Sequence, residues 1–171
     1  MTAILAFSDI YLDTSIAAAA ISSGDPHSAA CMTFCAHLAQ DNTTVYFSQL
    51  LRLEIAQFIR KLATDPRSFV PLSLYQQYQL RDFGANFMIR QQWMQFGMAQ
   101  FDALLSTFYR VFELPLRKQI WQQSIDLMSL HGLESYDAAH VATALQAGLN
   151  DLATVDGKFA RVSGLNVHIV R

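Results

Sequence analysis

Cysteines and charged residues are both scarce in this 171-residue sequence. Only 15% of the residues are charged, whereas 52% are hydrophobic, and just two are cysteines. Cys31 and Cys35 lie four positions apart in a helical pattern, and no second pair of Cys or His at metal-ligand spacing accompanies them. We therefore expect two reduced thiols in a core rather than a zinc site or a disulfide.

Long hydrophobic runs and early positive charge are missing as well. No uninterrupted apolar run reaches the roughly 20 residues that a membrane span needs. The first basic residue is Arg52, whereas signal and transit peptides carry positive charge near their start. We therefore expect a cytoplasmic protein without a membrane span, with part of its apolar surface covered by a partner or a second copy.

An excess of positive charge is also absent. The 12 Lys and Arg residues face 14 Asp and Glu residues, which gives a net charge of −2. A protein that binds nucleic acid by charge alone would be strongly basic. Contact with nucleic acid would therefore need a cation that neutralises clustered acidic groups. A helical DNA-binding regulator is disfavoured, because no basic recognition helix is present.

Short β-branched and aromatic segments alternate with helical patterns along the chain. Strands are expected at 10–12, 43–48, 109–115, 151–156 and 166–170, and helices at about 15–22, 27–40, 48–63, 115–131 and 135–147. This alternation predicts an α/β fold with a mostly parallel sheet of about five short strands, in a single domain spanning 1–171. The stretch 67–108 interrupts it, and there we expect two or three inserted helices, with breaks at Gly84 and Gly97.

Four acidic residues fall where such a fold would gather them. Asp13 and Asp156 each follow a strand, and ligands of parallel sheets collect outside the carboxyl ends of the strands. Glu54 lies about two turns into the helix after the second strand, and Asp137 lies in the first turn of its helix. Carboxylates brought together repel one another unless a cation holds them, and oxygen ligands without His or Cys suit Mg²⁺ or Mn²⁺.

Each acid also has an ordinary structural explanation. Asp13 could end a strand, and Asp137 could stabilise the positive end of its helix. Glu54 could form a surface ion pair with Arg60 or Lys61, although its apolar neighbours argue against a freely exposed helix face. The order of the motifs, taken together, favours the interpretation as a site.

Four segments resemble the PIN-domain family of ribonucleases, and most closely its VapC-type toxins. "IYLDTS" is similar to the family's first acidic motif, and "SQLLRLE" to its serine-led helix ending in glutamate. "YDAAHVATAL" resembles the family's most distinctive motif, and "LATVDGKF" its closing Thr-x-Asp-x-x-Phe signature, which here holds Thr154, Asp156 and Phe159. The resemblance runs from residue 10 to the C-terminus and implies a three-layer α/β/α architecture.

The resemblance implies a Mg²⁺- or Mn²⁺-dependent endoribonuclease that leaves a 5′-phosphate and a 3′-hydroxyl, with a toxin–antitoxin pair as its setting. Asp13, Glu54 and Asp137 would hold the metal directly or through water, and Asp156 would ligate it or orient a ligand. Supporting hydrogen bonds are expected from Thr14, Ser15 and Thr154. RNA would be the substrate, and a homodimer and a cognate antitoxin the protein partners.

Two other functions and one more residue stay open at this stage. A haloacid-dehalogenase-like phosphotransferase would need a second acid two residues after Asp13, where Ser15 stands. A catalytically silent PIN-like binding module is the alternative outside enzymes. His140 shares a helix face with Asp137 and is interpreted as a packing residue, with proton donation or phosphate contact as the alternative.

The insert and the expected helix at 27–40 are the expected contact surfaces. We predict a homodimer with residues of 27–40 and 67–108 at protein contacts, because the insert is rich in Phe and Met. The aromatic residues of the insert are interpreted as core or dimer surface rather than as stacking platforms for bases. Surface charge is likewise the default for the scattered basic residues Arg52, Arg81, Arg90, Arg117 and Lys118.

Overall fold

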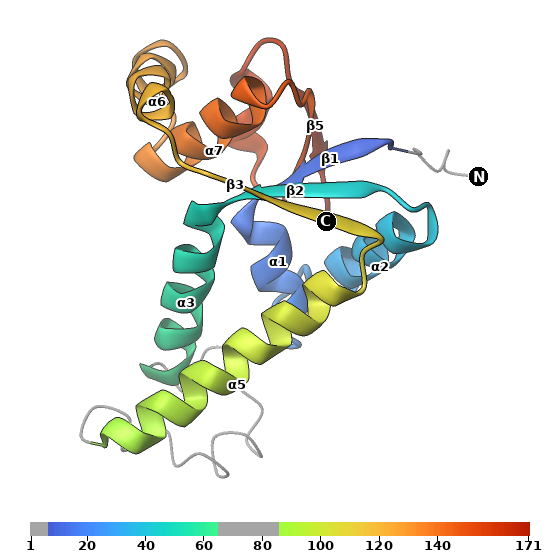
Figure 1. Cartoon of the computed structure of the whole chain (residues 1–171), viewed down its shortest axis with the longest axis vertical. Coiled ribbons are helices and arrows are strands. Elements are labelled where there is room, and N and C mark those ends of the chain that lie inside the picture. Colours follow the sequence, from blue (N-terminus) through green and yellow to red (C-terminus); the bar gives the residue numbers. More distant parts are fainter. Residues whose placement is uncertain (1–6, 65–85) are drawn as a thin grey trace.

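The computed structural model describes residues 7–64 and 86–171, and within them five strands form one sheet in the order β3-β2-β1-β4-β5 (Figure 1). The strands are β1 (Asp9–Leu12), β2 (Thr44–Ser48), β3 (Arg110–Leu114), β4 (Asp151–Thr154) and β5 (Asn166–Ile169). The helices are α1 (Thr14–Ile21), α2 (Ser28–Gln40), α3 (Gln49–Thr64), α5 (Phe87–Ser106), α6 (Lys118–His131), α7 (Ser135–Gln146) and the short 3₁₀ helix η2 (Gly157–Arg161). Every strand pairing is parallel, which confirms the expected sheet.

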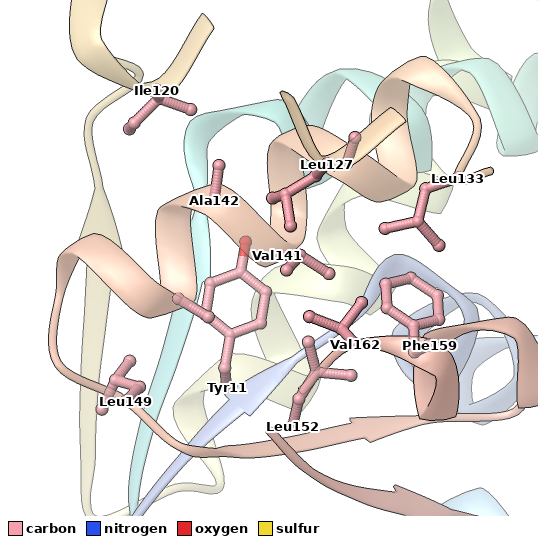
Figure 2. Packing of buried hydrophobic residues seen from close by; sticks show 12 residues of the cluster. Tyr11, Ile120, Leu127, Leu133, Val141, Ala142, Leu149, Leu152, Phe159 and Val162 are labelled. Atoms are coloured by element: carbon pink, nitrogen blue, oxygen red, sulfur yellow. The ribbon is translucent and has the colours of Figure 1, made fainter. Parts of the chain in front are cut away.

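Helices cover both faces of the sheet, so the three-layer α/β/α architecture is confirmed. Helices α6 and α7 lie on one face, and α1, α2, α3 and α5 lie on the other (Figure 1). Side chains of a strand point alternately to opposite faces. Tyr11 of β1 therefore packs with Val141 of α7 and Leu152 of β4 (Figure 2), whereas Ile10 and Leu12 pack on the side of α1 and α2.

Several details of the chain agree with the sequence-based predictions. Cys31 and Cys35 are free thiols buried on α2. Gly132 ends α6 with a φ of 64°, a left-handed conformation that residues with a side chain seldom adopt. No helix in the described ranges is both long and apolar enough to cross a membrane.

The helix expected from residue 115 starts later, at Lys118, because Arg117 is still extended, with a ψ of 160°.

The inserted region differs from its prediction. Residues 67–85, including Gly84, lie outside the described residues. The part that follows is one continuous helix, α5, so the predicted break at Gly97 is wrong. Gly97 is instead a contact point: a Cβ there would lie 2.5 Å from Cγ2 of Ile59 on α3. The glycine thus lets α5 approach α3 closely, and the Trp93 indole N–H donates to the Ile59 carbonyl over 2.8 Å.

Candidate active site

Asp13 lies at the carboxyl edge of the sheet, directly after the central strand β1. It is 5% exposed and caps α1, since its side chain accepts a hydrogen bond from the Ser15 backbone N–H. Its Oδ2 also accepts from the Ser15 hydroxyl over 2.5 Å and from the Thr154 hydroxyl over 2.9 Å. Because β1 and β4 are neighbouring strands, Thr154 at the end of β4 lies beside Asp13, which directly follows β1. The expected supporting roles of Ser15 and Thr154 therefore have a geometric basis.

Asp156 follows β4 in a turn that several hydrogen bonds hold in place. The Asp156 backbone N–H donates to the Thr154 hydroxyl over 2.9 Å, and the Val155 N–H donates to the Ser15 hydroxyl over 3.0 Å. The Asp156 carboxylate in turn accepts from the Lys158 N–H over 2.9 Å and so caps η2. The Lys158 ammonium lies 3.6 Å from the same carboxylate and 3.2 Å from that of Glu134.

Asp137 lies in the first turn of α7 and is partly buried. Burial, followed by the negative charges of Asp13, Asp156 and Glu134, raises the pKa of Asp137 to about 6, against an opposing effect of the Lys158 ammonium. These neighbours show that the structure brings three of the predicted acids, Asp13, Asp137 and Asp156, into electrostatic contact. Repulsion of this kind on Asp137 is a property expected of a cation site.

Glu54 lies at the same carboxyl edge of the sheet, near the start of α3, but in a different environment. Its side chain is 20% exposed, and its Oε2 lies 2.6 Å from Nε2 of His140 and 2.5 Å from the hydroxyl of Thr14. Burial alone would raise the pKa of Glu54, but the hydrogen bond and charge of His140, with the bond from Thr14, lower it below its ordinary value. A buried histidine is thus the ion-pair partner of Glu54 in the structure.

His140 has more contacts than the sequence analysis expected. It is 1% exposed in the middle of α7, as a packing residue would be. Both ring nitrogens nevertheless have polar partners, with Nδ1 lying 2.8 Å from the Tyr11 hydroxyl and 3.3 Å from that of Ser48. Burial lowers the pKa of His140, but the hydrogen bond to Glu54 and the charges of Asp13, Glu54 and Asp137 raise it overall. The feature of the sequence that indicated a site role for His140 was its position three residues after Asp137 on the same helix.

The structure also shows how several of the other side chains considered from sequence are used. Arg52 pairs with Asp102 over 3.0 Å and with Glu113 over 2.7 Å, so it joins α3 to α5 and β3. Trp93 and Phe101 are buried core residues, which confirms their predicted use. Arg81 lies outside the described residues.

Comparison with known proteins places this arrangement in a family. The family model of the PIN domain matches residues 10–165. The chain belongs to the PIN-domain family. Its closing motif within the PIN domain also agrees with the structure, because Phe159 of η2 is 1% exposed and packs in the core (Figure 2). No curated protein sequence matches the chain significantly.

Solved structures with a similar fold include three other proteins. VapBC2 from Rickettsia felis, bound to a DNA fragment from its promoter, aligns with a TM-score of 0.60 and 17% identity, covering 95% of this chain and 99% of that chain. The sarcin–ricin-loop-cleaving toxin VapC20 of Mycobacterium tuberculosis aligns with a TM-score of 0.53 and 18% identity, covering 88% and 92%. A Pyrobaculum aerophilum protein aligns with a TM-score of 0.53 and 17% identity, covering 95% and 90%.

The donor chemistry of this PIN domain fits a hard divalent cation. The described residues contain no group of three or more His, Cys, Asp or Glu side chains gathered as ligands of one ion. Mg²⁺ does not require such a cage, because it keeps several water ligands and binds proteins through one or two carboxylates. Asp13 and Asp137 provide oxygen atoms of that kind, and burial together with the neighbouring carboxylates raises the pKa of Asp137.

Proposed function

We propose that this protein is a metal-dependent endoribonuclease that acts in the cytoplasm as the toxin of a toxin–antitoxin pair. The observation that carries the proposal is that Asp13, Asp137 and Asp156 lie near one another at the carboxyl edge of a PIN-family sheet, so that burial and the charges of the other two raise the pKa of Asp137. Carboxylates gathered at a ligand-binding edge are what a phosphodiester hydrolase needs to recruit a cation beside a phosphate. The fold shared with VapC20, a toxin that cleaves an RNA loop, supports RNA as the substrate.

The residues take distinct roles in this proposal. Asp13 and Asp137 would hold Mg²⁺ or Mn²⁺ directly, with Glu54 and Asp156 as further ligands or as acceptors for bound water. The bound ion would supply charge neutralisation at the phosphate and a more acidic water molecule. Thr154 and Ser15 hold Asp13 through its Oδ2, which fixes the direction of the other carboxylate oxygen. Thr14 acts in the same way on Glu54.

Protein partners are proposed from the exposed apolar side chains. On α6, Trp121, Ile125 and Met128 are spaced as one helix face and are 48%, 59% and 39% exposed. On α2, Met32 is 57% exposed, and α5 begins with the exposed residues Phe87 and Met88. We propose that these faces are covered in a homodimer and by an antitoxin, and the VapBC2 assembly with a similar fold supports the second partner. The α6 face was not among the contact surfaces expected from sequence.

The test of the proposed activity is an RNA cleavage assay with mapped product ends. We expect purified protein with Mn²⁺ or Mg²⁺ to cleave total RNA or a sarcin–ricin-loop fragment, leaving 5′-phosphates and 3′-hydroxyls, and excess EDTA to abolish cleavage. Asp13→Asn should lose the activity. Asp151→Asn is the matched control, since Asp151 starts β4 at the opposite end and pairs with His168 over 2.7 Å.

Cleavage that persists in EDTA, or that survives Asp13→Asn, would show that the carboxylates are not the reaction centre. A pure, folded protein that cleaves none of the RNAs with either metal would favour the binding-module alternative instead.

A further inference from the structure

The buried histidine of α7 has a geometry that packing alone does not explain. His140 is 1% exposed, yet it contacts side chains of four other elements: β1, the end of β2, α1 and α3. Burying an imidazole costs free energy unless both of its nitrogens find partners. An apolar residue would fill the same space on this otherwise alanine-rich helix. The polar contacts of His140 therefore deserve an explanation of their own.

One side of the ring is anchored to the sheet. Nδ1 lies 2.8 Å from the Tyr11 hydroxyl and 3.3 Å from the Ser48 hydroxyl. Tyr11 is itself fully buried, and its ring meets that of His140 edge to face at 5.9 Å between centroids. Figure 2 shows the Tyr11 ring rising from β1 with its hydroxyl directed toward α7, next to Val141 and Ala142. A side chain packed so tightly on two rigid elements has a fixed orientation.

The other side of the ring addresses Glu54. An ionised carboxylate only accepts hydrogen bonds, so Nε2 of His140 must carry a proton and donate a hydrogen bond to Oε2 of Glu54 over 2.6 Å. The Thr14 hydroxyl donates to the same oxygen over 2.5 Å. Both donors thus hold Oε2, and Oε1 is the oxygen through which Glu54 can meet a ligand. Glu54 is a long side chain that would otherwise be free to change rotamer.

We propose that His140 is a positioning residue of this site, which fixes the Glu54 carboxylate through Oε2 and directs Oε1 toward a bound cation or its water. This inference rests on the proposed function for the identity of the ligand. It assigns His140 no contact with RNA or metal, and no proton transfer. Its effect on the site passes entirely through Glu54. The hydrogen bonds from Tyr11 to His140 and from His140 to Glu54 fix the Glu54 side chain of α3 relative to strand β1.

Two conservative substitutions separate positioning from packing. The side-chain nitrogen of Gln reaches as far as Nε2 of His, and that of Asn only as far as Nδ1. His140→Gln should therefore keep a donor for Glu54, and His140→Asn should lose it, although both bury one amide. Mn²⁺ affinity is measured by titration calorimetry, and kcat and KM are measured with RNA at saturating Mn²⁺. Circular dichroism confirms that each variant is folded at the assay temperature.

We expect His140→Asn to weaken Mn²⁺ binding and lower kcat by about 10-fold or more, the usual range for partners of metal ligands, with KM for RNA little changed. His140→Gln should retain most of both. In the background of Glu54→Gln, His140→Asn should add no further loss, because its route to the site is already cut. The matched control is His168→Asn, which breaks the other His–carboxylate pair, to Asp151, and should leave Mn²⁺ affinity and kcat unchanged.

Unchanged Mn²⁺ affinity in His140→Asn would overturn the inference, as would equal losses in Asn and Gln variants or a full additional loss in the Glu54→Gln background. The proposed function fails separately. A wild-type protein that cleaves RNA while His140→Asn behaves normally refutes positioning alone. A wild-type protein that binds Mn²⁺ but cleaves no RNA, with weaker binding in His140→Asn, refutes the nuclease alone. Failure of the wild type to bind Mn²⁺ would refute both.

Discussion

Replacing Asp137 with Asn should stabilise the metal-free protein at neutral pH. Burial and the charges of Asp13 and Asp156 raise the pKa of Asp137 from 3.8 to about 6. At about 1.4 kcal/mol per pKa unit, this shift of about two units corresponds to at most about 3 kcal/mol of destabilisation by the ionised form. Because the side chain keeps contact with solvent, we halve this figure, and we then subtract about 0.5 kcal/mol for the lost interaction with the helix N-terminus.

The net expectation for Asp137→Asn is a gain of about 1 kcal/mol in unfolding free energy, or roughly 2–4 °C in Tm for a chain of this size. The pH dependence has a definite sign. Between the unfolded pKa of 3.8 and the folded value of about 6, the folded wild type binds more protons than the unfolded chain, so its stability falls as pH rises through this window. The advantage of the variant should therefore be complete above about pH 6 and vanish near pH 4.

The assay is urea unfolding in EDTA at pH 7.5, 5 and 4, with Asp151→Asn as the control. Mg²⁺ should narrow or reverse the difference at pH 7.5, because the wild type binds the ion better and gains stability by mass action. A less stable variant at pH 7.5 in EDTA would refute the reasoning. Asp137 would then be a residue that stabilises its helix and not a member of a repulsive cluster.

Three further outcomes are expected. Chelation should abolish RNA cleavage, and added Mn²⁺ should restore it, whereas full activity in EDTA would contradict the metal assignment. Gly97→Ala should lower the unfolding free energy by about 1–3 kcal/mol in urea denaturation, because its Cβ would overlap the buried side chain of Ile59. The control Gln95→Ala, on the exposed face of the same helix, should leave the unfolding free energy unchanged. An unchanged unfolding free energy in Gly97→Ala would refute the close packing of the two helices. Light scattering at micromolar concentration should give a dimer mass, and a stable monomer would contradict the proposed assembly.

Much of the fold was predictable because its signals are local. The alternation of β-branched segments with helical patterns is enough to expect a parallel sheet, and the residue after each strand must then lie at the carboxyl edge. Asp13 and Asp156 were located in this way, and the first-turn position of Asp137 followed from the helix start at Ser135. None of these inferences depends on how the helices pack against one another.

The errors arose where a residue's role depends on a distant partner. Gly97 was interpreted as a helix break from composition, whereas its lack of a side chain serves the contact with Ile59 on another helix. Glu54 and His140 are 86 residues apart, and their contact depends on how α3 and α7 are rotated about their axes. A hydrophobic pattern shows which face of a helix is buried, but it does not show which polar atoms meet within that buried layer.

The opposite pKa shifts of Glu54 and Asp137 divide the site into two parts. The hydrogen bonds of His140 and Thr14 hold the pKa of Glu54 below its usual value despite burial, so this carboxylate is ionised with its charge already compensated. Asp137 has no comparable compensation from Lys158, and its pKa is raised. A bound cation would relieve the repulsion on Asp137, so we expect it to lie nearer Asp137 than Glu54. The His140–Glu54 pair then serves to fix one oxygen atom in place, while the aspartates supply the attraction.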